Sequence, residues 1–295
     1  MADRPYVDVP VGPLAGAAPA AATAARRWGL PSPVPLRAGM NALFAAGDVV
    51  LRVGRPTAPA SAAVALADVL RAAGIPAPEP VEASAVEHGD LAVTAWERLD
   101  LLDVAPDWRA VGALVAKVHA LDPASLPAAY PRPRYDAFPW WRLDEQLAAV
   151  ADVVDDAARD GLARAIERTR GWAGATDLVV CHGDLHPGNV VVTADGPVLL
   201  DWDLLCAGPP QWDHGMLLRV ERWGGDPRWY DDLASGYGTS FRGDRLAADI
   251  AEARLIAATL LRLQAGRTDE AARTEAQRRL AFWRGDPAAP PWTAQ

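Results

Sequence analysis

Three oxygen-bearing side chains in the second half of the sequence have a spacing that fits phosphoryl-transfer chemistry. Asp184 lies in a predicted turn, Asn189 follows five residues later, and Asp201 follows Asn189 after twelve more. Phosphoryl transfer from a nucleotide needs a carboxylate that orients the acceptor hydroxyl and takes its proton. It also needs oxygen ligands for the magnesium ions that bridge the phosphates. Either aspartate alone would more often be a turn or cap residue, but the combined spacing favours the functional interpretation.

Short strands are predicted around these residues, over 178–181, 190–193 and 198–200. Asp195-Gly196 between the last two is typical of a hairpin turn. Because a hairpin folds the chain back on itself, we expect Asp201 to lie beside Asn189. The loop–strand–turn–strand arrangement is therefore expected to bring the three side chains together.

The residues from 181 to 189 read Cys-His-Gly-Asp-Leu-His-Pro-Gly-Asn, and Leu-Leu-Asp-Trp-Asp follows at 199–203. With these motifs the chain resembles the aminoglycoside phosphotransferase and choline-kinase-like branch of the protein-kinase fold, over roughly residues 34–283. The resemblance implies that Asp184 is the catalytic base and that Asn189 and Asp201 are magnesium ligands. It also implies a second contact to metal or substrate from Asp203.

The resemblance further implies an α+β fold with two lobes, a small β-rich N-terminal lobe and a larger, mainly helical C-terminal lobe. Patterning agrees, since predicted strands dominate before residue 100 and helices after it. We expect a flexible Ala/Pro arm over 1–25, a nucleotide-binding lobe over 26–99, and a catalytic and acceptor-binding lobe over 100–295.

Residues around the motif receive simpler roles. His182 and His186 are expected to support the loop rather than to transfer protons. Asp213 is expected to cap the following helix or to pair with an arginine.

The nucleotide-facing part departs further from the family pattern. Gly39 and Asn41 lie where a glycine-rich phosphate loop is expected, but the segment has one glycine. Lys117, the only lysine of the chain, is predicted on a helix far along the sequence. The phosphate-binding cation is therefore expected to be Arg52, because a guanidinium is always charged and matches phosphate oxygens.

The family pattern also places a glutamate on the helix after this strand, as partner of the cation. The predicted helix contains no glutamate over 60–70, and its one acid is Asp68. Backbone atoms of Trp96 and Arg98 are expected to bind the purine of ATP or GTP at the hinge between lobes. The implied cofactors are thus ATP, or GTP, and Mg²⁺.

Composition limits the partners. With 29 basic and 38 acidic residues the net charge is −9, which argues against nucleic-acid binding. The sequence has no apolar run of about twenty residues, so no membrane partner is expected. Two cysteines without metal-type spacing favour a cytoplasmic location. The oligomeric state stays open.

The acceptor is expected to be a small molecule with a hydroxyl group, cationic and bound in the C-terminal lobe. Indole rings and carboxylates there suit an amine-bearing sugar; they are Trp140, Trp141, Trp212, Trp223, Trp229, Trp283, Glu221, Asp226, Asp231 and Asp232. The leading hypothesis is a kinase of an aminoglycoside or related antibiotic, with a role in antibiotic resistance.

Three alternatives remain. The first is a metabolic kinase of an amino sugar or amino alcohol. The second is a nucleotide-binding pseudokinase, suggested by the missing helix glutamate and the poor glycine loop. The third is a metal-dependent hydrolase built on His182, Asp184 and His186, although the sequence offers no further ligand cluster.

Overall fold

The structure of this protein is a computed structural model that describes residues 10–56 and 58–293. Its contacts divide the chain into two units. Unit 1 comprises residues up to 107 with 117–133 and 187–206, and unit 2 comprises 108–116, 134–186 and the residues from 207 onward. The first segment ends close to the boundary expected near residue 100. Two later segments also belong to unit 1, and one bond that ties them in joins the Leu102 N–H to the Val192 carbonyl at 2.8 Å.

A five-stranded antiparallel sheet forms the centre of unit 1, in the order β1-β2-β3-β5-β4. Tight turns join β1 to β2, β2 to β3 and β4 to β5, and Gly47, between β2 and β3, has a φ of +67° that suits glycine. The strands are β1 (Val34–Ala38), β2 (Ala42–Ala46), β3 (Val49–Gly54), β4 (Val86–His88) and β5 (Leu91–Glu97).

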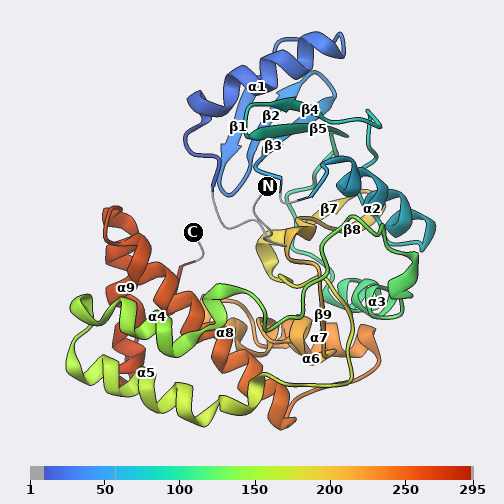
Figure 1. Cartoon of the computed structure of the whole chain (residues 1–295). Coiled ribbons are helices and arrows are strands. Elements are labelled where there is room, and N and C mark those ends of the chain that lie inside the picture. Colours follow the sequence, from blue (N-terminus) through green and yellow to red (C-terminus); the bar gives the residue numbers. More distant parts are fainter. Residues whose placement is uncertain (1–9, 57, 294–295) are drawn as a thin grey trace. The chain divides into compact units, whose positions relative to one another are not determined.

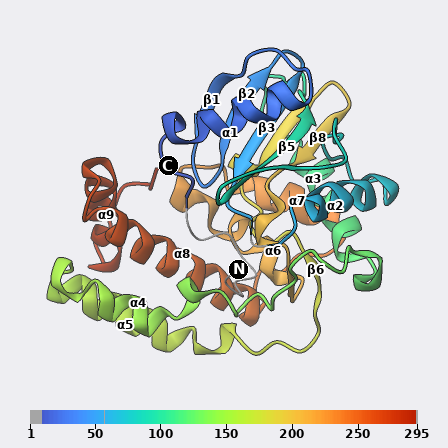
Figure 2. The same cartoon turned by 45° about the horizontal axis from the view of Figure 1, so that its top comes forward.

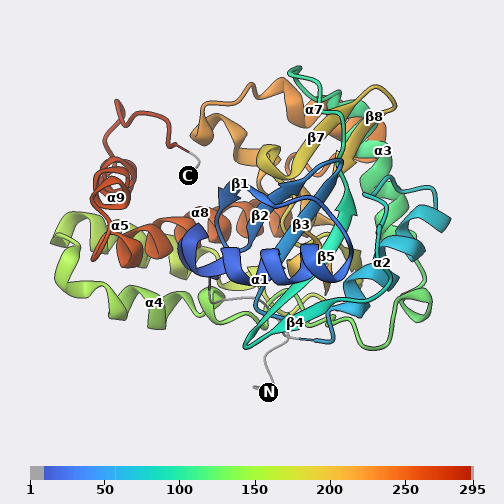
Figure 3. The same cartoon turned by 90° about the horizontal axis from the view of Figure 1, so that it is seen from above.

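Helix α1 (Leu14–Arg27) covers one face of this sheet (Figure 1, Figure 3). Fully buried alanines on one side of the helix pack against Phe44, Leu51 and Val53. Here the structure differs from the loose arm expected over 1–25, since residues from Leu14 onward are helical; residues 1–9 lie outside the described part. Small side chains at helical spacing let the helix approach the sheet closely, despite a proline within it.

The rest of unit 1 holds α2 and the strands of the motif. Lys117 donates from Nζ to the Gly74 carbonyl at 2.8 Å, just beyond the end of α2, so the single lysine has a structural contact. The elements are α2 (Ser61–Ala72), η1 (Pro123–Ser125), η5 (Pro187–Asn189), β7 (Val190–Thr193), β8 (Gly196–Leu199) and η6 (Trp202–Leu204).

Unit 2 is built around the long helix α8 (Arg245–Ala265), which packs against α4, α5, α6 and α9 (Figure 2). The close approach of α5 and α9 needs a glycine, because a Cβ on Gly161 would lie 1.8 Å from the Trp283 carbonyl oxygen. The other elements that lie wholly or partly in this unit are α3 (Trp108–His119), η2 (Pro139–Trp141), α4 (Leu143–Ala149), η3 (Ala151–Val153), α5 (Asp156–Arg168), η4 (Arg170–Trp172), β6 (Val179–Cys181), β9 (Cys206–Gly208), α6 (Gln211–His214), η7 (Leu217–Trp223), α7 (Arg228–Tyr237) and α9 (Glu270–Trp283).

The mixed architecture confirms the predicted α+β class. No helix in the described part of the chain is long and apolar enough to span a membrane.

A buried ion pair joins α9 to the C-terminal segment of unit 2. Arg279 and Glu275 are 2% and 3% exposed, and Nε of the arginine lies 2.9 Å from Oε1 of the glutamate. Thr293 donates to both carboxylate oxygens and accepts from the guanidinium. The guanidinium also lies 4.8 Å from the centre of the Trp223 ring and 5.3 Å from that of Trp292. Both charged groups of the pair therefore have hydrogen-bond or aromatic partners in addition to each other.

Replacing one partner should therefore destabilise unit 2. Arg279→Met removes the buried counter-ion of Glu275 and leaves this carboxylate with Arg278, which is 40% exposed. We therefore expect the free energy of unfolding to fall by up to about 3–5 kcal/mol. The control is Arg159→Met, which breaks an exposed pair with Asp156 and should cost about 0–1 kcal/mol. Urea unfolding followed by tryptophan fluorescence measures both, and equal losses would contradict the importance of burial.

Candidate active site

In unit 2, the loop that carries Asp184 is held through its backbone by Asp213. The His182 and Gly183 N–H groups donate to the two Asp213 carboxylate oxygens at 2.8 and 2.9 Å. Gly183 has a φ of +91°, which only glycine adopts without strain. The expectation that Asp213 caps a helix was wrong: it lies inside α6 and accepts from the loop.

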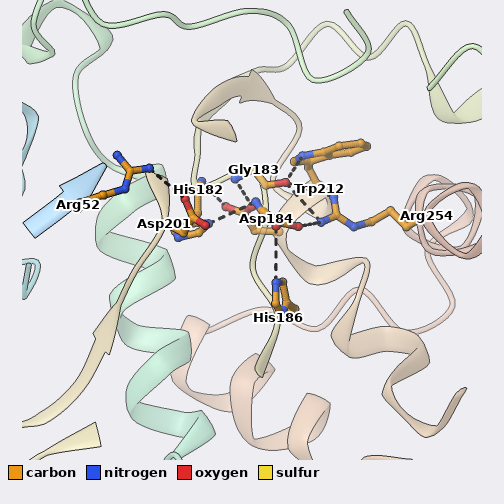
Figure 4. Close-up of polar contacts among 9 residues, drawn as sticks. Arg52, His182, Gly183, Asp184, His186, Asp201, Trp212 and Arg254 are labelled. Carbon is orange, nitrogen blue, oxygen red and sulfur yellow. Dashed lines mark hydrogen bonds and ion pairs between the residues drawn. The ribbon is translucent and has the colours of Figure 1, made fainter. Parts of the chain in front are cut away.

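Arg254 on α8 reaches the same loop from the other side (Figure 4). Its guanidinium donates to the Gly183 carbonyl and to Asp184 Oδ1, each at 3.3 Å. The Trp212 indole donates to that carbonyl as well, at 3.1 Å, and its ring lies 4.8 Å from the guanidinium. Arg254 is 5% exposed, so a buried cation fixes the position of Asp184.

Asp184 itself remains reachable, since its side chain is 37% exposed. Its other carboxylate oxygen lies 3.6 Å from Nε2 of His186. Burial by itself raises the pKa of Asp184, whereas the contact with His186 and the Arg254 charge lower it by more, so this pKa lies below its ordinary value. Asp184 is therefore ionised at neutral pH and can accept a proton.

In unit 1, the hairpin of β7 and β8 brings Asn189 and Asp201 together. Val190 pairs with Leu199, and the Leu200 N–H donates to the Asn189 carbonyl at 2.9 Å. Asp201 therefore follows directly after the residue that is bonded to Asn189, as the hairpin argument predicts.

The backbone of Asp201 is left-handed, with φ +64° and ψ +71°. Among the described residues it is the one non-glycine residue with positive φ, and such outliers gather at functional sites. The carboxylate of Asp201 and the buried amide side chain of Asn189 supply the hard oxygen ligands that Mg²⁺ prefers. The two residues therefore fit the ion that the sequence predicts.

Arg52 lies on β3, on the sheet face opposite α1, and its side chain contacts two aspartates of unit 1. One terminal nitrogen lies 3.7 Å from Asp201 Oδ1 (Figure 4). The same nitrogen is in direct contact with Asp203 Oδ2. Asn41 Nδ2 donates to the same Asp203 oxygen at 3.0 Å. Burial alone lowers the pKa of Arg52, but Asp203 and Asp201 raise it by more, so this pKa lies above its ordinary value.

Both halves of the site fall within a segment that a family model recognises. The model, described as a phosphotransferase enzyme family, matches residues 42–256. The chain belongs to this family. Among curated proteins, none matches the chain by sequence.

Solved structures share the fold of this phosphotransferase. A spectinomycin phosphotransferase in complex with ADP and spectinomycin gives a TM-score of 0.63 at 15% identity, covering 86% of this chain and 89% of that one. A GDP complex of an aminoglycoside 2'-phosphotransferase gives 0.71 at 16%, covering 91% and 96%. A choline/ethanolamine kinase family protein from Mesorhizobium loti gives 0.60 at 19%, covering 86% and 87%. The predicted family resemblance and kinase-like fold are confirmed.

The segment predicted as a hinge, with Trp96 and Arg98, lies within unit 1 and makes hydrogen bonds there. The Arg98 N–H donates to the Asp48 carbonyl at 3.0 Å, and the Trp96 indole donates to Thr94 Oγ1 at 2.8 Å. Gly39, in the turn between β1 and β2, donates its N–H to the Asn41 carbonyl. Purine binding by Trp96 and Arg98 stays a prediction, and a purine at Arg98 would have to displace an existing bond.

The tryptophans expected to line one acceptor site fall into separate aromatic clusters of unit 2. Trp141 and Trp212 pack beside Arg254, Trp229 stacks on Trp108, and Trp223 and Trp283 pack on Trp292. Three of the four acids already pair with arginines: Glu221 with Arg219, Asp226 with Arg228, and Asp231 with Arg242. The structure therefore does not gather these residues around one cationic group.

Sequence reasoning missed Arg254. It lies four residues after Ile250, on the buried side of an apolar helix, and a charge at such a position is the signal that could have identified it.

Removing the Asp213 carboxylate should loosen the catalytic loop. Asp213→Ala leaves two buried N–H groups without that acceptor, which costs about 1–3 kcal/mol for each. We expect a lower melting temperature and faster amide exchange at His182 and Gly183. Asp226→Ala, which removes an exposed ion pair, is the matched control, and identical exchange in both variants would contradict this role for Asp213.

Proposed function

We propose that this phosphotransferase moves the γ-phosphoryl group of ATP or GTP to a hydroxyl of a small molecule, an aminoglycoside or a related antibiotic. The observation that carries the proposal is Asp184, an accessible carboxylate kept ionised and oriented by Arg254 and His186. Structural relatives solved with ADP and spectinomycin, and with GDP and kanamycin, support the nucleotide and the acceptor class.

Asp184 acts as the base in this proposal. Its carboxylate accepts a hydrogen bond from the acceptor hydroxyl and takes the proton as the new P–O bond forms. Arg254 and the backbone bonds to Asp213 keep the carboxylate in place, so little reorganisation is needed during the reaction.

The nucleotide phosphates are assigned to unit 1. The planar guanidinium of Arg52 offers several donors to phosphate oxygens and keeps its charge at every relevant pH. When bound to Asn189 and Asp201, Mg²⁺ supplies neutralisation of phosphate charge.

Two of the three competing hypotheses, the hydrolase and the pseudokinase, fit the contacts less well. In a hydrolase, His182 would ligate a metal, but it is fully buried and its Nδ1 accepts the Asp184 N–H at 3.3 Å. A pseudokinase would not need an ionised Asp184 held by a buried cation. A metabolic kinase of an amino sugar or amino alcohol would use the same chemistry. Both cysteines are free thiols, which agrees with the proposed cytoplasmic location.

Asp184→Asn tests the base. The amide cannot take the proton, so we expect kcat to fall by about 10²–10⁴-fold while ADP still binds. Acceptor-dependent ADP release, screened over aminoglycosides, macrolides, amino sugars and amino alcohols, measures the effect and identifies the acceptor. Asp195→Asn, at the exposed hairpin tip, should behave like the wild type. Unchanged turnover in Asp184→Asn would refute the mechanism.

Arg254→Met tests the electrostatics of the base through pH. Activity is lost as pH falls through the pKa of Asp184, because the protonated acid cannot accept a proton. Since the Arg254 charge lowers that pKa, its removal should move the acid limb of the kcat/KM profile to higher pH. Arg254→Lys keeps the charge and should stay closer to the wild type. An unmoved limb in Arg254→Met would show that this charge does not act on Asp184.

A further inference from the structure

The cation assigned to the phosphates lacks the partner that the family pattern places on the following helix. The one acid of α2, Asp68, is exposed. The residues near the start of α2 that share a pocket with Arg52 are small and apolar: Ala60, Ala62 and Ala63. No side chain of α2 can therefore orient the guanidinium from this direction.

Asp203 is instead the acidic partner of Arg52. Its Oδ2 atom contacts a terminal nitrogen of Arg52 directly, and the two side chains are 16% and 26% exposed. An arginine side chain has many rotamers, and fixing one of them costs entropy that a partly buried counter-ion offsets. The contact therefore sets where the guanidinium lies on the sheet face.

Asp203 is itself held from several sides within unit 1. Asn41 donates to the same carboxylate oxygen that Arg52 contacts. The neighbouring Trp202 carbonyl accepts from the Tyr130 hydroxyl at 2.9 Å, and the Trp202 indole donates to the Leu199 carbonyl at 3.2 Å. These bonds fix the turn after Asp201, so Asp203 is a rigid anchor for the longer arginine.

A glycine on β3 leaves room for this arrangement. A Cβ on Gly54 would lie 2.5 Å from Asn41 Oδ1, so any larger residue there would push the Asn41 side chain aside. The sheet thus leaves space for the amide that orients Asp203.

We propose that Asp203, oriented by Asn41, is the positioning residue that holds Arg52 for phosphate binding in place of the missing helix glutamate. This inference rests on the proposed function, in which Arg52 binds the nucleotide phosphates. It also assigns the carboxylate oxygen of Asp203 to the arginine and leaves Asn189 and Asp201 as the metal ligands.

Replacing Asp203 by a neutral residue should change nucleotide affinity, and the direction of this change separates a positioning role from a simple charge effect. A carboxylate beside a phosphate site repels the phosphates, so its removal should tighten nucleotide binding if it does nothing else. If Asp203 positions Arg52, its removal should instead weaken binding. The difference is visible without metal and without turnover.

The experiment measures ADP and GDP binding by calorimetry in the presence of a chelator. Asp203→Asn and Arg52→Ala should each weaken binding of the nucleotide that the wild type prefers by about tenfold, the size of one charge-assisted hydrogen bond. The double variant should lose little more than either single one, because both changes remove the same interaction. Asp68→Ala, which removes the one acid of α2, is the matched control and should bind like the wild type.

Two further variants keep the test independent of the stability of Asp203→Asn. Asn41→Ala and Gly54→Ala leave both charges in place and disturb the orientation of Asp203, and Gly54→Ala does so while keeping the Asn41 side chain, so each should weaken binding by a smaller factor. Tighter or unchanged binding in Asp203→Asn, or in these two variants where Asp203→Asn does not fold, overturns the inference. If Arg52→Ala itself binds like the wild type, the assignment of Arg52 in the proposed function fails instead.

Discussion

Two arginine side chains, the buried Arg254 in unit 2 and the partly buried Arg52 in unit 1, each organise the candidate site residues of their own unit. A buried cation is costly unless carboxylates, carbonyls or aromatic faces surround it. Arg254 meets this requirement with the Gly183 carbonyl, the Asp184 carboxylate and the Trp212 ring. Arg52 meets it with Asp203 and Asp201. Each guanidinium has few carboxylate, carbonyl or aromatic partners within reach. Each partner carboxylate is therefore held in a narrow range of positions.

The same pairing sets the chemistry of the carboxylates. A cation beside an acid keeps the acid ionised, which a proton acceptor needs at neutral pH. The aromatic rings beside Arg254 exclude water and strengthen this interaction. Arg254 therefore both positions the Asp184 carboxylate and keeps it ionised, so a substitution of Arg254 changes both together.

The parts of the site that were predictable depend on short stretches of chain. The hairpin that joins Asn189 and Asp201 could be predicted because its turn and both strands lie within about a dozen residues. The contacts of Arg254 with Asp184 and of Arg52 with Asp203 join residues 70 and 151 positions apart. No periodic pattern connects such residues, so these partners were visible only in the fold.

Two other differences have local physical causes. The N-terminal helix was missed because prolines and glycines interrupt its pattern, whereas its alanines pack tightly once a sheet is present. The tryptophans were read as one acceptor surface because composition does not show which rings face one another. In the fold they pack on each other and on arginines, so they stabilise unit 2 in separate clusters.

In the proposed nucleotide site, this geometry suits an arginine at the position where the family pattern has a lysine. A lysine has three donors on a single nitrogen, so a partner carboxylate and the phosphates must both gather around one point. A guanidinium has three nitrogens in one plane and can hold an acid with one edge while another edge remains available. Lys117 is bonded at the end of α2. In the proposal, Arg52 and Asp203 together replace the lysine and the helix glutamate of the family pattern. In this proposal, the anchor after Asp201 takes over the role of the helix glutamate.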